Sequence, residues 1–289
     1  MEEARLRIGE LSRRAGVSAD VLRAWERRYG LLEPARTASG YRLYSEDDLA
    51  RVQAMRAHIA QGLSAAEAAG LARSGAAAPP GDGAADHAAE LWASLDAFDN
   101  ARAQAAFDRL VADFTVETLL REAVLPYLRL LGDRWGSGDA SVAQEHFAST
   151  LLRERLLALA RGWDRGVGPL ALLACAPGER HDLGLVAFGI ALRGIGWRIT
   201  FLGADTPIDT LAAASAQLEP DAVVVAALSP EPLHSVARRL ATLAKERNVF
   251  LAGAGADDAL AEHVGAERLR SGPLEAVAEL VTASAPHRA

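Results

Sequence analysis

The sequence predicts a multidomain chain in three parts: an all-α winged helix-turn-helix, a four-helix bundle and an α/β doubly wound parallel sheet. Three patterns support this prediction. Two short helical patterns joined by a glycine turn come first, four longer apolar helical patterns follow, and strand and helix patterns then alternate to the end. We place the first part at residues 1–74, a linker at 75–86, the bundle at 87–165 and the sheet at 166–289.

The composition excludes several classes of protein. A chain of 289 residues has room for two or three domains, and 50% of its residues are hydrophobic, so it is able to build buried cores. No apolar run reaches the length of about 18 residues that a membrane span needs, and no charged-then-apolar leader precedes Ile8. The single cysteine, Cys175, excludes a disulfide within one chain. We therefore expect a soluble cytoplasmic protein with no membrane partner.

The first pair of helices has the order of a helix-turn-helix. A short helix is predicted over 6–16 and ends at Gly16, and Ser18 is placed to cap a second helix that runs to Tyr29. Residues 23–42 hold five arginines and two glutamates, although the whole chain carries a net charge of -7. Basic charge is thus concentrated on and beside the helix that would enter the major groove of DNA.

A β-hairpin wing is predicted over 34–44, with its turn at Ser39-Gly40. The stretch from Ile8 to Tyr44 resembles the DNA-binding domain of the MerR family, which implies double-stranded operator DNA as a partner. The side chains expected to contact bases in the groove are Arg23, Arg27 and Arg28. The side chains expected to hold phosphates are Arg36, Tyr41 and Arg42.

Four apolar helical faces between His87 and Trp163 predict the four-helix bundle. Trp135 follows the third face, and Glu145 and His146 stand at the entrance of the fourth helix. A lone tryptophan is most often a core residue. A flat indole is also able to cover a ligand, while a neighbouring carboxylate bonds to the hydroxyl or amine groups of that ligand. Both interpretations of Trp135 stay open at this point.

One histidine stands where a parallel sheet presents its ligands. The run from Leu170 to Ala176 is continuously apolar, as a strand buried on both faces should be, and His181 follows it at the carboxyl edge. Glu179 and Asp182 are both near enough to accept a hydrogen bond from the ring nitrogen that does not face a metal. Gly184 would let a large planar ligand approach the backbone. The alternative is a solvated histidine at the start of a helix.

These residues carry a family resemblance. The pattern Glu179-x-His181-x-x-Gly184 resembles the cobalamin-binding Rossmann domain, in which the loop histidine replaces the dimethylbenzimidazole base as the lower cobalt ligand. Trp135, nine intervening residues and then Glu145-His146 resemble the motif that covers the upper axial group in photoreceptor regulators of the CarH and LitR type. With the MerR-like N-terminus, the three resemblances cover nearly the whole chain in the order of that family.

The resemblance implies a function and a set of residues. It implies a transcriptional regulator, not an enzyme, that binds adenosylcobalamin, forms a tetramer in the dark and releases operator DNA after light breaks the cobalt–carbon bond. The cobalt ligand from the protein would be His181 alone. The cofactor-binding residues implied are Trp135, Val142, Glu145, His146, Glu179, Arg180, His181, Asp182, Gly184, Gly203, Asp205, Thr206, Ala226, Leu228 and Gly253.

The chain departs from the family pattern at three places. Ala226 stands where the cobalamin domains usually have the serine of a Ser-x-Leu motif, and the lost hydroxyl would cost about 1 kcal/mol of binding. Ala252 stands where the first glycine of a Gly-Gly pair is usual, and its methyl would narrow the nucleotide channel. Gly136 follows the motif tryptophan, where light-dependent members often have a histidine that takes the upper cobalt position after illumination.

These departures leave two alternatives open. The first is a MerR-type regulator that responds to cobalamin without light, or that acts without a ligand, and it follows from Gly136 and Ala226. The second is a cobalamin-dependent methyl-transfer module, because a helical bundle joined to a Rossmann-like domain is also used there. The fused DNA-binding part speaks against the second alternative.

Overall fold

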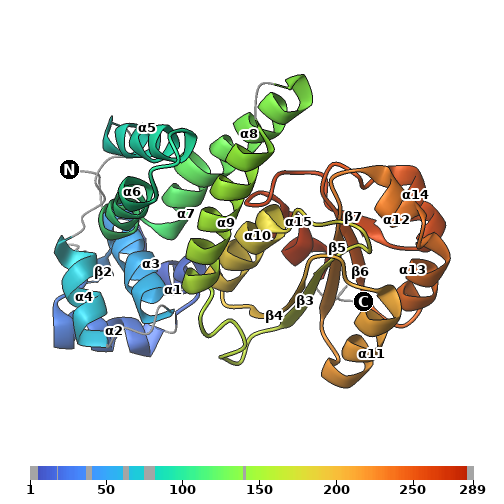
Figure 1. Cartoon of the computed structure of the whole chain (residues 1–289). Helices are drawn as coiled ribbons and strands as arrows, with labels where there is room; N and C mark the ends of the chain where they lie inside the picture. Colours follow the sequence, from blue (N-terminus) through green and yellow to red (C-terminus); the bar gives the residue numbers. More distant parts are fainter. Residues whose placement is uncertain are drawn as a thin grey trace. The chain divides into compact units, whose positions relative to one another are not determined.

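The computed structural model describes residues 6–17, 19–36, 41–60, 65–74, 82–138 and 141–284. The chain forms two compact units, Met1–Asp82 and Gly83–Ala289, and each is described by itself (Figure 1). The predicted cap Ser18 and the predicted wing turn Ser39-Gly40 lie outside the described residues. Among the helices that are described, none is both long and apolar enough to cross a membrane.

The first unit contains four helices and a two-stranded antiparallel sheet within its described residues. Its elements are α1 (Ile8–Ala15), α2 (Ala19–Tyr29), β1 (Ala35–Arg36), β2 (Arg42–Leu43), α3 (Glu46–Ala60) and α4 (Ala65–Ser74). Gly16 ends α1 in the left-handed conformation, with φ of 63°, and its amide bonds to the Ser12 carbonyl. The core of this unit includes Leu11, Leu22, Tyr44 and Met55, all fully buried.

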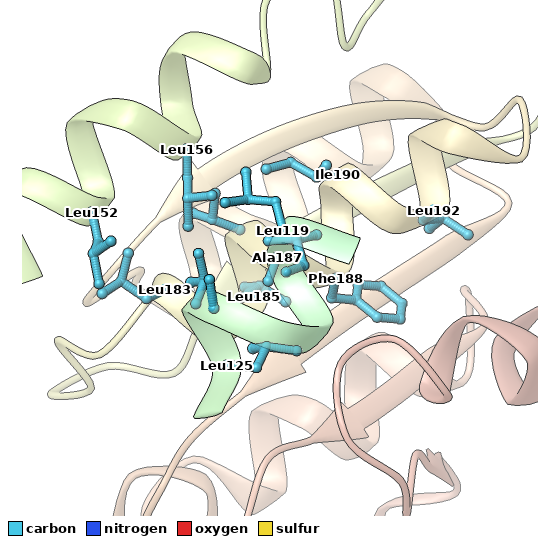
Figure 2. Packing of buried hydrophobic residues seen from close by; sticks show 14 of the residues in the cluster. Leu119, Leu125, Leu152, Leu156, Leu183, Leu185, Ala187, Phe188, Ile190 and Leu192 are labelled. Carbon is cyan, nitrogen blue, oxygen red and sulfur yellow. The ribbon is translucent and has the colours of Figure 1, made fainter. Parts of the chain in front are cut away.

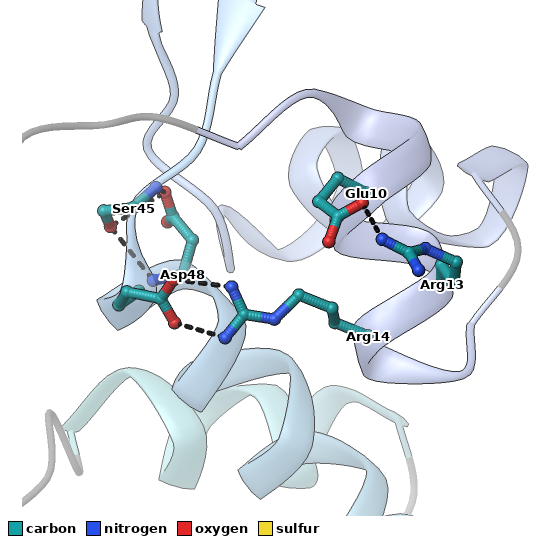
Figure 3. Close-up of polar contacts among 6 residues, drawn as sticks. Glu10, Arg13, Arg14, Ser45 and Asp48 are labelled. Atoms are coloured by element: carbon teal, nitrogen blue, oxygen red, sulfur yellow. Dashed lines mark hydrogen bonds and ion pairs between the residues drawn. The ribbon is translucent and has the colours of Figure 1, made fainter.

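Reciprocal hydrogen bonds fix the start of α3, as Figure 3 shows. The Asp48 amide donates to Ser45 Oγ at 3.1 Å, and the Ser45 amide donates to Asp48 Oδ2 at 3.0 Å, so two helix-end amides are satisfied. The other carboxylate oxygen of Asp48 accepts from the Glu33 amide at 3.0 Å. Arg14 of α1 forms two hydrogen bonds with Glu46, at 2.6 and 2.8 Å. These contacts hold the segment before the wing, α1 and α3 together.

The second unit begins with the helical bundle. Its elements are α5 (Asp82–Asp96), α6 (Asn100–Asp113), α7 (Val116–Thr118), the π-helix η1 (Leu119–Val124), α8 (Leu125–Ser137) and α9 (Val142–Leu159). Because α5 begins at Asp82, the linker predicted over 75–86 is too long at its C-terminal end. The buried face of α5 starts with Ala84 and Ala88. Alanines give a weak apolar signal, so the sequence pattern did not reveal this part of the helix.

The third helical segment of the bundle is continuous but irregular. Pro126 lacks an amide donor and its ring clashes with the carbonyl four residues earlier, so a regular α-helix is unfavourable there. The chain forms the π-helix just before it, and the Trp92 indole donates to the Ala123 carbonyl at 2.9 Å. A side chain thus satisfies a carbonyl in the irregular turn.

The rest of the second unit is a doubly wound parallel sheet, as predicted. The strands, all parallel in the order β4-β3-β5-β6-β7, are β3 (Leu170–Cys175), β4 (Arg198–Gly203), β5 (Ala222–Ala226), β6 (Val249–Ala252) and β7 (Glu267–Arg268). The helices are α10 (Leu183–Gly194), α11 (Ile208–Leu218), α12 (Pro230–His234), α13 (Ala237–Ala244), α14 (Asp258–Val264) and α15 (Ala276–Ala283). The strand order reverses at β3. Sheets of this kind bind their ligands at the reversal, outside the loops after β3 and β5, and we call this edge of the sheet the crevice.

The two faces of the sheet bury different cores. On one face, Leu172, Val223 and Leu251 pack with the helices α11, α13 and α14. On the other face, the sheet packs with α10 and α15, and the same core continues into the bundle. Figure 2 shows leucines of η1, α8 and α9 beside the apolar residues of α10. The labelled residues are Leu119, Leu125, Leu152, Leu156, Leu183, Leu185, Ala187, Phe188, Ile190 and Leu192. The bundle is therefore held on α10 by a shared hydrophobic core.

The loops after β5 and β6 approach each other too closely for side chains. A Cβ on Gly255 would lie 2.1 Å from the Ser229 carbonyl oxygen, and a Cβ on Gly253 would lie 2.3 Å from that of Ala227. Gly253 also has a φ of 85°, which favours glycine. These two glycines set the spacing of the loops at the carboxyl edge of the sheet.

We predict that Gly255→Ala lowers the free energy of unfolding of the second unit by about 1–3 kcal/mol, because the methyl group meets backbone atoms that cannot move away singly. The matched control is Gly136→Ala in α8, where a Cβ meets no atom of the described residues within 4 Å. This control should be neutral or stabilise the unit by about 0.4–1 kcal/mol. Urea unfolding followed by circular dichroism measures both, and equal midpoints for the two variants would contradict the close packing of the loops.

Candidate functional site

The loop between β3 and α10 is fastened to the neighbouring loop of the sheet. The Glu179 carbonyl accepts from the Asp205 amide at 2.8 Å, and the Gly178 amide donates to Asp205 Oδ1 at 2.6 Å. Asp205 follows β4 with a positive φ of 47°. The buried Thr206 donates its hydroxyl to the Gly203 carbonyl at 3.2 Å. Asp205 therefore ties the segment after β4 to the segment that carries His181.

The buried carboxylate of Glu179 fixes the position of His181 by hydrogen bonds. Glu179 Oε1 accepts from the His181 amide at 2.8 Å and bonds the ring Nδ1 at 2.7 Å. Glu179 Oε2 accepts from the Leu228 amide, in the loop after β5, at 2.7 Å. Burial alone would raise the pKa of Glu179, but donation from Leu228 and His181 outweighs it and holds this pKa below its usual value.

The contact with Glu179 decides which ring nitrogen of His181 is left for a metal. A carboxylate only accepts, so Nδ1 carries a proton, and in the neutral ring Nε2 is the nitrogen whose lone pair is left for a metal. The His181 side chain is 64% exposed, while Glu179 beside it is 4% exposed. The arrangement presents one oriented imidazole at the crevice of the sheet, which suits a metal whose other ligands come from a macrocycle.

The spacing suggested that Asp182 would bond the His181 ring, but in the structure its partner is Arg153. Its carboxylate accepts from Arg153 of α9, with Nε at 2.9 Å and Nη2 at 2.8 Å from Oδ2. Asp182 is 3% exposed. Of the two acidic residues that we considered for the ring hydrogen bond, Glu179 makes it. Arg153 is a residue that the sequence analysis missed, because only the fold brings it to this loop.

The departures at Ala226 and Ala252 lie side by side. Strand pairing places Cys175 opposite Ala226, and Ala226 opposite Ala252, at the carboxyl ends of three adjacent strands. Cys175 belongs to the core on the α10 side of the sheet, and the partly buried Ala226 and Ala252 pack against this core. Burial, together with the charges of Asp182 and Glu179, raises the pKa of Cys175 to about 12, so this thiol is a packing residue and not a nucleophile at neutral pH.

The bundle supplies a second group of candidate residues, at the ends of α8 and α9. Trp135 and Val142 are each 53% exposed. Large apolar side chains that are exposed together often mark a binding site. Glu145 accepts from the Ser149 hydroxyl at 2.7 Å, and the His146 ring lies 3.5 Å from Glu145. A capping box of Ser141 and Gln144 starts α9 and so fixes where these side chains stand.

The remaining candidates lie at the crevice or beside it. Arg180 and Leu228 are exposed next to the fixed loop residues. Gly184 lies in the first turn of α10, where an added Cβ would meet only Pro273, at 3.9 Å. The loop residues Glu179, His181, Asp205 and Leu228 are thus brought together by hydrogen bonds, and the bundle residues form a group of their own.

The predicted groove contacts lie on α2 of the first unit. Arg23, Arg27 and Arg28 are exposed on this helix. Tyr41, before β2, is 70% exposed, and the side chain of Arg36 lies outside the described part of the chain. An exposed run of arginines on the second helix of a helix-turn-helix is the arrangement that reads the major groove.

Glu26 connects this helix to the wing and was not singled out from the sequence. Glu26 Oε1 accepts from Arg42 Nε at 3.0 Å, and Glu26 Oε2 accepts from the Tyr44 hydroxyl at 3.0 Å. Burial, then the hydrogen bond to Glu26, raises the pKa of Tyr44 to about 12. Arg42 is therefore positioned by an ion pair on the protein while its side chain stays 44% exposed.

Comparisons with known proteins agree with this organisation. The chain matches the family models described as MerR HTH family regulatory protein, over residues 6–75, and B12 binding domain, over 88–160 and again over 169–268. The chain belongs to the family of MerR-type regulators that carry B12-binding domains. Cobalamin is accordingly the cofactor class of its B12-binding domains, and DNA is the partner class of its helix-turn-helix.

Individual relatives match most of the chain. It is 35% identical to the HTH-type transcriptional repressor CarH of Myxococcus xanthus, over 89% of this chain and 91% of the relative. It is 36% identical to the repressor CarA of the same organism, over 88% of each. The monomethylamine corrinoid protein of Methanosarcina barkeri has the same fold, with a TM-score of 0.58 at 17% identity, over 67% of this chain and 96% of that one. These matches confirm the predicted family and fold class.

The residues of the crevice fit a cobalamin. A lower ligand needs one imidazole with a free Nε2, and His181 provides it with Nδ1 held by Glu179. The macrocycle needs backbone without bulky side chains nearby. At Gly184 and Gly203 the nearest described atom to an added Cβ lies 3.9 Å away. Ala226 lacks the hydroxyl of the serine that is usual at this position. The loop after β5 is still held, because the Leu228 amide donates a hydrogen bond to Glu179.

We predict that Arg42→Ala weakens binding to operator DNA and reduces the slope of log affinity against log salt by about 1, since the variant loses a positioned charge that we expect to hold one phosphate. Fluorescence anisotropy over a series of salt concentrations measures both quantities. Arg102→Ala, which removes the same charge from the bundle, is the control and should leave the slope unchanged. An unaltered affinity and slope in Arg42→Ala would exclude this arginine from the interface.

Proposed function

We propose that the chain is a transcriptional repressor that senses light through adenosylcobalamin. The observation that carries the proposal is the oriented imidazole of His181, held by Glu179 at the crevice of a sheet whose family binds B12. The relatives CarH and CarA are both named as transcriptional repressors. In this role the chain works in the cytoplasm as a regulator and catalyses no reaction.

Each group of residues has a proposed part in holding the cofactor. His181 Nε2 would take the lower position on cobalt, and Glu179 would keep the ring in the required tautomer. The residues proposed to line the macrocycle and its nucleotide are Arg180, Asp182, Gly184, Gly203, Asp205, Thr206, Ala226, Leu228 and Gly253. The residues proposed to cover the upper group are Trp135, Val142, Glu145 and His146. When bound, the cofactor supplies a cobalt–carbon bond that light is able to break.

The switch requires two states that bind the cofactor differently. Trp135 and Val142 would contact the adenosyl group in the dark, so removal of this group removes contacts that favour one seating of the bundle. We propose that the dark form is a tetramer that occupies the operator. Loss of the contacts with the adenosyl group would weaken the tetramer and so lower its affinity for DNA.

Size-exclusion chromatography with absorbance detection tests this proposal on the full chain loaded with adenosylcobalamin. We expect a large cobalamin-containing species in darkness that becomes smaller after green light. Bound cobalamin with no change of size would contradict the light switch and leave a cobalamin-responsive regulator. No co-eluting cobalamin would contradict the sensor function itself.

One observation favours the light-independent alternative and leads to a prediction. Gly136 stands where light-dependent members of the family that the sequence resembles often carry a histidine. In the part of the chain that the structure describes, no atom lies within 4 Å of an added Cβ there. We predict that the Gly136→His variant folds normally and that its new imidazole binds cobalt as a second axial nitrogen after illumination. The illuminated variant should then exchange its axial ligand for cyanide more slowly than the wild type. The absorption spectrum before and after light measures this change. An identical photoproduct spectrum in both proteins would show that position 136 does not face cobalt.

We predict that His181→Ala lowers retention of cobalamin and removes the absorption features of nitrogen ligation on the lower side, because Glu179 holds no other imidazole among the described residues. The control is His263→Ala, an exposed histidine on α14. Both proteins are loaded in the dark, desalted and scanned. A spectrum of His181→Ala that matches both wild type and the control would mean that the metal is held by another group.

A further inference from the structure

The two acidic residues beside His181 face different parts of the molecule. Glu179 bonds the histidine ring and the loop after β5, within the sheet domain. Asp182 bonds Arg153, which lies on the bundle helix α9. The residue on one side of His181 therefore fixes the ring, and the residue on the other side connects the same loop to the bundle.

The contact between Arg153 and Asp182 has the geometry of a strong ion pair. The guanidinium uses two nitrogens, Nε at 2.9 Å and Nη2 at 2.8 Å from Oδ2, and Nε is also 3.1 Å from Oδ1. The Asp182 side chain is 3% exposed, whereas the Arg153 side chain is 46% exposed. If Arg153 moved away, a buried carboxylate would lose the partner that compensates its burial, which is strongly unfavourable.

Helix α9 carries candidate residues for the opposite side of the cofactor. Glu145, Ser149 and Arg153 are spaced by four residues, so they follow one another along one side of the helix over about 12 Å. The Ser149 hydroxyl donates to Glu145 at 2.7 Å. One rigid helix thus holds Glu145, which belongs to the upper-group motif, and Arg153, which holds the loop of the lower ligand.

We propose that Arg153 is a positioning residue for His181, and that the Arg153–Asp182 pair couples the lower-ligand loop to the seating of α9 on the sheet domain. This inference rests on the proposed cobalamin site. When the pair is closed, His181 and Glu145 are held by the same helix and loop assembly. A displacement of α9 beside the upper group then also displaces the lower-ligand loop, and loss of the lower ligand weakens the contact of α9 with the sheet domain.

Hydrogen exchange and absorption spectra of full-length variants test the coupling. Arg153→Ala removes the pair, and Arg153→Lys keeps a charge but loses the two-nitrogen fork. The matched control is Arg155→Ala on the same helix, because Arg155 bonds Gln104 at 3.0 Å and pairs with Asp108 inside the bundle. Each protein is measured without cofactor and with saturating adenosylcobalamin in darkness.

In the cofactor-free protein, we expect Arg153→Ala to speed amide exchange in the segment 178–186 by about tenfold, Arg153→Lys less, and Arg155→Ala not at all. At saturating cofactor, Arg153→Ala should also have a smaller fraction of cobalt with its lower nitrogen bound, which a purely structural role in the bundle would not change. Restoration of part of that fraction in Arg153→Lys supports the coupling.

The proposal is overturned if segment 178–186 exchanges in Arg153→Ala as it does in wild type, or if Arg155→Ala speeds it equally. A wild-type protein that takes up no cobalamin would instead contradict the proposed function. In that case the cofactor-free comparison still decides whether Arg153 holds the loop.

Discussion

A carboxylate buried among three N–H donors has little freedom to move, and Glu179 is such a group. It binds the amide and the ring of His181 with one oxygen and the Leu228 amide with the other. The loops after β3 and β5 meet at the point where the sheet order reverses, so this single side chain spans the crevice that the fold provides for a ligand. The tautomer and position of the candidate cobalt ligand both depend on it.

The same loop also depends on contacts outside the sheet. Asp205 holds it from the side of β4, and Arg153 holds it from the bundle. Below these polar contacts, leucines of α9 and η1 share one core with α10. A change at the upper side of the site and a change at His181 therefore act on one packed assembly, which is what a sensor that controls DNA binding at a distance requires.

The sequence predicted the fold well where each element has a local signal. The continuous apolar run before His181 gave β3, and the glycine turn gave the break between α1 and α2. It failed where the signal is weak or broken. The start of α5 is built on alanines. The alternation of strand and helix patterns implies one helix between β5 and β6, but this segment begins with Pro230 and Pro232 and forms two helices, α12 and α13.

The site was predictable only in part, for a physical reason. A motif such as Glu-x-His-x-x-Gly names residues close in sequence, so His181 and Glu179 could be found. Arg153 is separated from Asp182 by 29 positions and Glu26 from Arg42 by 16, and no local pattern marks such partners. Spacing alone also left Glu179 and Asp182 equivalent, and the three-dimensional contacts distinguish them.

The central claim is that a histidine of this chain, positioned by Glu179, binds cobalt from below. Electron paramagnetic resonance of the cobalt(II) form, in protein whose histidines carry the heavier nitrogen isotope, tests it most directly. If His181 binds cobalt, the isotope changes the nitrogen splitting of the cobalt signal, because the axial nitrogen belongs to the protein. A splitting that is the same in labelled and unlabelled protein would exclude a histidine ligand, since the nitrogen on cobalt would then be that of the cofactor's own base.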